Sequence, residues 1–139
     1  MAQASTIKDS WKHQLVKEAM RARQQAYAPY SRYLVGAALQ TKTGEIITGS
    51  NIENASYGLT NCAERTAIFT AIHKGLSDIE AIAVVTEKGG MPCGACRQVL
   101  NEFNPYMTII IANQSGEIIS ELSLADLLPQ AFGPNNLAS

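Results

Sequence analysis

Apolar residues at helical spacing predict four helices along the chain. A first helix, capped by Ser10 and ended by the proline-containing segment 27–31, should bury Leu15, Ala19, Ala22 and Ala26. A second helix should begin at Cys62 and end at Lys74-Gly75, where glycine can adopt a left-handed cap. Its predicted core positions are Ala63, Ala67, Ile68, Ala71 and Ile72. Two further helices are predicted at 92–103 and 122–128.

Short apolar runs bounded by turn-forming residues predict five strands, at 33–41, 45–48, 81–85, 107–112 and 117–119. The first two should pair as a hairpin. Between this hairpin and the helix at Cys62, residues 49–61 are a polar loop long enough to carry function. The order of elements predicts an α/β fold with one mixed five-stranded sheet and helices on both faces, which makes three layers.

Length and composition favour a single globular domain over residues 1–139. The chain is 46% hydrophobic and 17% charged, so disorder is excluded. No apolar run approaches the roughly 18 residues that predict a membrane span. The net charge of −1 and the pI near 6.1 make it a poor binder of nucleic-acid phosphates. Residues 1–8 and 133–139 should be loosely held.

The chemistry of the chain is concentrated in its three cysteines, Cys62, Cys93 and Cys96. Three thiolates can bind a zinc ion and leave its fourth tetrahedral position open, as a catalytic zinc requires. Glu64 stands two residues after Cys62 and can carry protons for a water at that position. His73 lies about 16 Å from Cys62 along the predicted helix, so the two cannot share an ion. The pattern predicts one catalytic zinc ion per chain.

Other interpretations of the cysteines stay open at this point. Cys62 could be a buried small hydrophobe, and Cys93 with Cys96 could be a redox pair, although neither explains Glu64. A binding module held together by structural zinc is a third possibility, which needs a fourth protein ligand. The odd number of cysteines and a first segment without the apolar stretch of a secretory signal predict reduced thiols in the cytoplasm.

The N-termini of the predicted helices place the sulfurs in an electrostatic field that favours thiolates. Cys62 and Cys93 should begin two helices that follow neighbouring strands, so that two positive helix ends converge on the ion. Three thiolates with zinc leave one excess negative charge. Arg65 and Arg97 are adjacent to ligands in the sequence, and either could donate to a sulfur and restore acidity to the metal, with Arg65 the stronger candidate.

The fragments Cys62-Ala63-Glu64 and Pro92-Cys93-Gly94-Ala95-Cys96 match the signature of zinc deaminases, with cysteine as the first ligand. The chain resembles the small homotetrameric cytidine deaminases of pyrimidine salvage along nearly its whole length. The other matching segments are 27–31, 35–39, 51–57, 61–69, 92–100 and 127–132.

The resemblance implies zinc-dependent hydrolytic deamination of cytidine and deoxycytidine to uridine and deoxyuridine plus ammonia, with no organic cofactor. It implies that Cys62, Cys93 and Cys96 are zinc ligands and that Glu64 is the proton shuttle. Asn51 and Glu53 would hold the ribose 3′-hydroxyl. Residues that would flank the base or reach across subunits are Tyr33, Ala55, Tyr57 and Phe132. Relatives commonly have phenylalanine where this chain has Tyr33, whose hydroxyl needs a polar partner.

Two related activities compete with this assignment. A deaminase of polynucleotides would need a cluster of basic residues, whereas the chain has none and carries a net charge of −1. A deaminase of cytosine-like antibiotics would have no use for the ribose-type loop at Asn51-Ile52-Glu53-Asn54.

Overall fold

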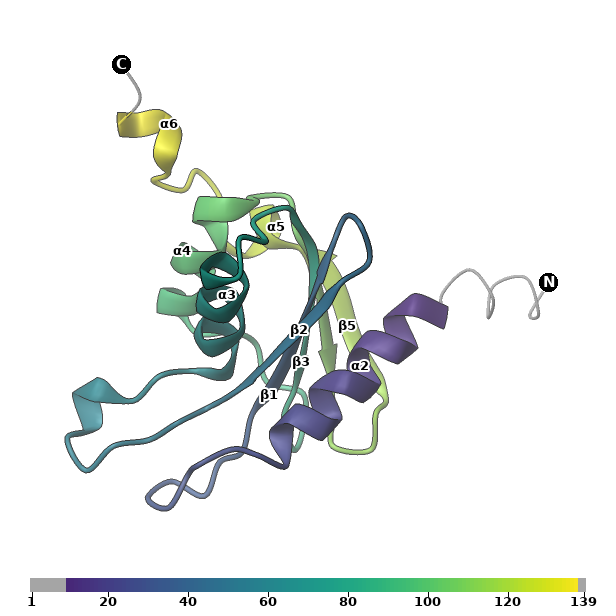
Figure 1. Ribbon diagram of the computed structural model, residues 1–139, viewed down its shortest axis with the longest axis vertical. Helices are drawn as coiled ribbons and strands as arrows, with labels where there is room; N and C mark the ends of the chain where they lie inside the picture. Colours follow the sequence, from purple (N-terminus) through teal and green to yellow (C-terminus); the bar gives the residue numbers. More distant parts are fainter. Residues whose placement is uncertain (1–9, 138–139) are drawn as a thin grey trace.

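The structure of the protein is a computed structural model that describes residues 10–137 (Figure 1). Its elements in chain order are α2 (Ser10–Arg23), β1 (Gly36–Thr41), β2 (Ile46–Ser50), the 3₁₀ helix η1 (Tyr57–Leu59), α3 (Ala63–His73), β3 (Ile79–Val85), α4 (Gly94–Phe103), β4 (Thr108–Ala112), β5 (Ile118–Ser123), α5 (Leu124–Leu127) and α6 (Pro134–Leu137). None of the helices in this range is long and apolar enough to cross a membrane.

The five strands form one mixed sheet in the order β2-β1-β3-β4-β5. Only β3 and β4 run parallel, joined through α4, while the other neighbours are antiparallel. The carboxyl ends of β3 and β4 therefore lie at one edge of the sheet, from which the loops toward α4 and β5 depart. The predicted mixed five-stranded sheet is confirmed.

Alternating residues of the strands supply two cores on opposite faces of the sheet. On one face, α3 and α4 cover a cluster that includes Leu39, Ile82 and Ile109. On the other, α2 covers a cluster that includes Ala38 and Ile110. Figure 1 shows α2 on one side of the strands and α3 with α4 on the other. Because both faces are buried, the central strands are apolar throughout, and the predicted three layers are confirmed.

Two glycines in the hairpin allow the helices to lie against the sheet. A Cβ at Gly36 in β1 would stand 2.0 Å from the carbonyl oxygen of Ala19 in α2. A Cβ at Gly49 in β2 would stand 2.5 Å from the amide nitrogen of Ala67 and 2.6 Å from the carbonyl oxygen of Ala63, both in α3. The second contact fixes how closely the first turn of α3 approaches the sheet.

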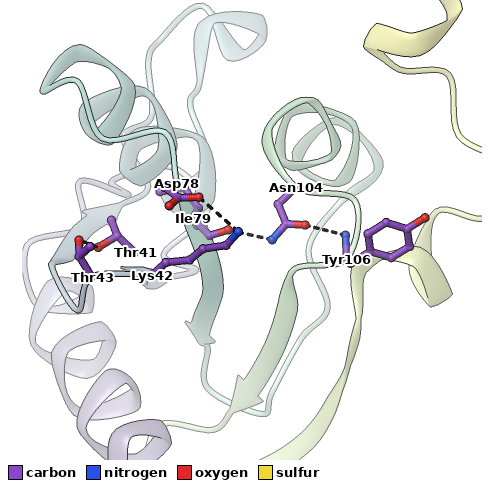
Figure 2. A network of polar contacts seen from close by, with 7 residues as sticks. All are labelled: Thr41, Lys42, Thr43, Asp78, Ile79, Asn104 and Tyr106. Carbon is purple, nitrogen blue, oxygen red and sulfur yellow. Dashed lines mark hydrogen bonds and ion pairs between the residues drawn. The ribbon is translucent and has the colours of Figure 1, made fainter.

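Polar contacts join the turns at the end of the strands that is remote from the cysteines (Figure 2). Lys42, in the turn after β1, donates its N–H to the carbonyl oxygen of Asp78 at 2.9 Å and places its ammonium 3.5 Å from the carboxylate. The Asn104 amide donates to the carbonyl oxygen of Ile79 and accepts from the N–H of Tyr106, at 2.8 and 2.9 Å. These bonds tie together the turns that enter β2, β3 and β4.

Several predicted boundaries are wrong. The first strand begins at Gly36 rather than at 33, and β2 extends to Ser50. The first helix ends at Arg23, which leaves the predicted core residue Ala26 half-buried in the following turn. The last strand covers 118–123 and the helix after it is only 124–127.

The structure also differs from the predicted strand order, and it forms a helix near the C-terminus. The strands that precede Cys62 and Cys93 are β2 and β3, which are not neighbours because β1 lies between them. Of the residues predicted to be loosely held, 134–137 form α6, whereas residues 1–8 and 138–139 lie outside the described part of the chain.

Candidate active site

The starts of α3 and α4 bring the three cysteine sulfurs together. Cys62 and Cys93 are the N-cap residues of these helices, and Cys96 lies in the first turn of α4. The sulfurs of Cys62 and Cys93 are 3.9 Å apart and those of Cys93 and Cys96 are 3.4 Å apart. All three lie within 4.8 Å of one another. Both helix N-termini point at the cluster, which favours thiolate over thiol.

This cluster fits a zinc ion. Tetrahedral Zn–S bonds of about 2.3 Å place sulfurs about 3.8 Å apart, close to the separations found here. The pKa shifts of the thiols agree with a metal site. A hydrogen bond from Cys96, and then the neighbouring Arg65, lower the pKa of Cys62 to about 5, whereas contact with Cys62 and burial raise the pKa of Cys96. Thiolates this close repel one another, so full ionisation of the cluster requires a cation such as zinc.

Glu64 is the carboxyl group beside the cluster. It lies in the first turn of α3, and the residue is only 4% exposed. Burial is the main cause that raises its pKa to about 7, and the charge of Cys62 adds to the effect. A carboxyl group with a pKa near the working pH can both take up and deliver a proton.

The two candidate arginines differ in what they contact. Arg65 donates from Nη2 to the sulfur of Cys62 at 3.2 Å. Arg97 reaches no sulfur: its Nε donates to the carbonyl oxygen of Pro92 at 2.8 Å and its Nη1 to that of Leu127 at 3.1 Å. Arg65 is thus the arginine that can offset the negative charge of the thiolates, and Arg97 instead links the main chain before α4 to the end of α5.

A cavity of about 280 Å³ opens beside the cysteines. Two metal-ligand candidates, Cys62 and Cys93, line it together with Glu64. The other lining residues are Ser31, Tyr33, Val35, Asn51, Glu53, Thr60, Val84, Thr86, Gly90 and Met91. Six of the predicted site residues therefore line one cavity, namely Cys62, Cys93, Glu64, Asn51, Glu53 and Tyr33.

The predicted sugar-binding residues are held by backbone groups. The side chain of Asn51 donates to the carbonyl oxygen of Tyr33 at 2.7 Å and accepts from the N–H of Val35 at 3.0 Å. Glu53 accepts from the N–H groups of Tyr30 and Ser31 at 2.9 and 3.1 Å, and from the Ser31 hydroxyl. That hydroxyl is the main cause that lowers the pKa of Glu53, so its carboxylate stays ionised and fixed.

Three of the predicted substrate-contacting residues lie outside this cavity. Ala55 and Tyr57 are exposed, and the Tyr57 ring stands 5.7 Å from that of Tyr30 beside an adjoining hollow of about 240 Å³. Phe132 is 59% exposed and follows α5. The protomer alone does not bring these three to the cysteines.

Sequence reasoning missed residues that shape the cavity from its loops. The Thr86 hydroxyl accepts from the N–H groups of Gly89 and Gly90 at 2.9 and 2.6 Å, which folds the loop after β3 against the site. A Cβ at Gly90 would stand 2.7 Å from the Tyr33 hydroxyl, so this glycine makes room for the tyrosine. Ser31 had a detectable signal, since it lies two residues after Pro29 in a segment that resembles the family.

Comparisons with known proteins agree with this site. Residues 9–112 match the family model described as the cytidine and deoxycytidylate deaminase zinc-binding region. The cytidine deaminase of Halalkalibacterium halodurans is 56% identical over 121 residues, which cover 85% of this chain and 91% of that protein. The Mycobacterium tuberculosis enzyme is 45% identical, with 81% and 82% covered. The crystal structure of cytidine deaminase from Burkholderia pseudomallei superimposes with a TM-score of 0.82 at 50% identity, covering 86% of this chain and 98% of that one.

Fold and site together define a zinc-dependent hydrolase that acts on an amino-substituted ring. The chain belongs to the cytidine deaminase family. The predicted family, enzyme class and zinc cofactor are confirmed, and the redox-pair and structural-zinc interpretations are set aside.

Proposed function

We propose that this chain hydrolyses free cytidine and deoxycytidine to uridine and deoxyuridine with release of ammonia, as a step of pyrimidine salvage in the cytoplasm. One observation carries the proposal: a single cavity joins a three-sulfur metal cluster, the buried carboxyl of Glu64 and the fixed carboxylate of Glu53. The first two serve the ring and the third serves the sugar. The thiols of the cluster need a reducing compartment, which supports the cytoplasmic assignment.

The three thiolates of Cys62, Cys93 and Cys96 would hold the zinc ion, whose Lewis acidity makes water acidic enough to supply a nucleophile near neutral pH. Glu64 takes the proton of that water and delivers it to N3 of the cytosine ring, which prepares C4 for attack. After the hydroxide adds to C4, Glu64 takes the proton of the new C4 hydroxyl and delivers it to the amine, so that the C4–N bond breaks and ammonia departs as the C4 carbonyl forms. Its raised pKa suits both transfers.

Asn51 and Glu53 would bind the ribose 3′-hydroxyl. The Glu53 carboxylate is fixed by three donors and still has lone pairs for a hydroxyl. The Asn51 amide keeps one N–H after its bond to the Tyr33 carbonyl. Tyr33 lines the same cavity and would flank the base with its ring.

The walls of the cavity favour a nucleoside over a nucleotide. Among the residues that line it, all of which belong to the described part of the chain, there is no lysine or arginine. A phosphate on the sugar would approach the Glu53 carboxylate without a cation to balance it. This distinction matters because the matching family includes deoxycytidylate deaminases.

The substrate experiment compares cytidine, deoxycytidine, cytidine monophosphate, single-stranded DNA and a cytosine antibiotic, with ammonia release as the readout. We expect turnover of the two nucleosides and a kcat/KM at least about 100-fold lower for the others, because each lacks a matching sugar contact or adds unbalanced charge. Comparable kcat/KM for the monophosphate would overturn the nucleoside assignment. Failure to release ammonia from any substrate by zinc-loaded protein would overturn the function as a whole.

We further propose a homotetramer in which each active site is shared between chains. The exposed Phe132 would stack on the base in a neighbour's site, and Ala55 and Tyr57 would also reach across the interface. An exposed aromatic anchor with no pocket in its own protomer supports this arrangement. Light scattering should give about four times 15.0 kDa. A fully active monomer would refute the shared site.

A hybrid assembly tests the sharing directly. Phe132→Ala should raise KM for cytidine, and Glu64→Gln should lower kcat at least about 100-fold. Co-expression of the two variants should restore sites with a normal KM, because an intact Glu64 would then meet an intact Phe132 from a neighbour. Hybrids whose remaining activity keeps the high KM of Phe132→Ala would show that the ring serves its own chain.

A further inference from the structure

The segment 128–133, which joins α5 to α6 and carries Phe132, is held by side chains of α4. Gln98 Nε2 and Asn101 Nδ2 both donate to the carbonyl oxygen of Phe132, at 2.9 and 3.3 Å. The backbone of Phe132 is therefore fixed to the helix, while its ring stays 59% exposed. A fixed backbone and an exposed ring together make the ring available to a second chain in one defined position.

Arg97 ties the same segment to the residue that precedes the ligand Cys93. Its guanidinium spans the carbonyl oxygens of Pro92 and Leu127, at 2.8 and 3.1 Å. Pro92 directly precedes the ligand Cys93, and Leu127 is the last residue of α5, from which the segment departs. The planar fork of arginine holds two acceptors at a set spacing, which a lysine cannot do.

The segment approaches α4 closely at Gly133. A Cβ at Gly133 would stand 3.0 Å from Asn101 Nδ2. Gln130 has a φ of 51°, a left-handed conformation that a residue other than glycine keeps only when its surroundings hold it. Around these contacts the segment borders a hollow of about 390 Å³, so hydrogen bonds contribute much of what places it.

We propose that Arg97, Gln98 and Asn101 are positioning residues that set where the Phe132 ring is presented relative to Cys93 and Cys96 of the same chain. The inference rests on the proposed role of Phe132 in a neighbour's site. Since α4 also carries Cys96 and follows Cys93, one helix fixes two metal ligands of its own site and the aromatic ring offered to another. A displacement of α4 is thereby felt in two active sites at once.

A double-mutant cycle tests the proposal with KM for cytidine as the readout. The double variant Gln98→Glu/Asn101→Ala removes both donors and places a carboxylate near the Phe132 carbonyl. It should raise KM about five- to tenfold, with kcat within about twofold and zinc content unchanged. In a Phe132→Ala background the same changes should have no further effect on KM, because they act through the ring. If the double variant loses zinc, Gln98→Glu alone, at an exposed position, is used in the same cycle.

A matched control and a metal readout complete the test. Gln14→Glu also removes an amide donor, which bonds Glu18 within α2. Because α2 lies on the opposite face of the sheet from α4, this change should leave KM unchanged. Arg97→Met should raise KM and also speed zinc loss to a chelator, a rate that the double variant should not change.

The outcomes separate the two proposals. If Phe132→Ala itself leaves KM unchanged, the shared site is wrong. If Phe132→Ala raises KM but the double variant has a normal KM, or its effect multiplies in full with that of Phe132→Ala, the positioning role is overturned. Unchanged zinc release and KM in Arg97→Met would likewise overturn the part assigned to Arg97.

Discussion

Gly49→Ala should show how tightly β2 sets the position of α3, the helix that carries Glu64. The added Cβ would stand 2.5 Å from the amide nitrogen of Ala67, against an ordinary contact that begins at 3.4 Å, a shortfall of about 0.9 Å. The obstructing atoms belong to the backbone and cannot rotate away, so α3 must shift by a comparable amount. Its first turn carries Glu64 and follows Cys62. A displacement of about 1 Å at reacting groups can cost about 100-fold in rate, and overpacking costs about 1–3 kcal/mol of stability.

The assay pairs kcat for cytidine with the melting temperature at a fixed protein concentration. For a chain of this size the stability loss corresponds to about 3–10 °C. The control is Thr48→Ser, which changes one methyl group on the exposed side of the same strand and should leave both quantities nearly unchanged. Wild-type stability and turnover in Gly49→Ala would refute the idea that close packing of β2 against α3 places the site.

Two further substitutions test the surroundings of the metal and of the sugar. Arg65→Gln removes the charged donor at 3.2 Å from the Cys62 sulfur; it should lower kcat/KM about 10- to 100-fold with one zinc still bound, and an unchanged kcat/KM would remove Arg65 from the site. Ser31→Ala removes the hydroxyl that fixes Glu53 and lowers its pKa; it should raise KM for cytidine about fivefold with little change in kcat, and a normal KM would show that the two backbone donors suffice.

Much of the fold could be predicted because its helices have apolar residues at helical spacing and its buried strands are short, continuous apolar runs. The failures have two different physical causes. Residues 33–35 look like a strand, yet the Asn51 side chain bonds the carbonyl of Tyr33 and the N–H of Val35 and keeps this stretch out of the ladder. The last strand is longer than its apolar run because alternate residues of β5 face solvent at the edge of the sheet.

The metal cluster could be predicted because ligand chemistry restricts residue type and spacing. The walls of the cavity could not, since they depend on which loops meet. Nothing in the local sequence shows that Ser31 would hold Glu53 or that the Thr86 loop would face Tyr33. The roles of Ala55, Tyr57 and Phe132 rest on a second chain and stay predictions.

Turnover of cytidine by the zinc-loaded Glu64→Gln variant, measured beside the wild-type protein, tests the central claim most directly. The amide keeps the shape of the side chain and cannot shuttle protons, and general acid–base catalysis is worth about 10²–10⁴-fold. We expect wild-type protein to form uridine and ammonia, and the variant to lose at least about 100-fold in kcat while it retains one zinc per chain. Near-normal kcat in the variant would contradict the mechanism.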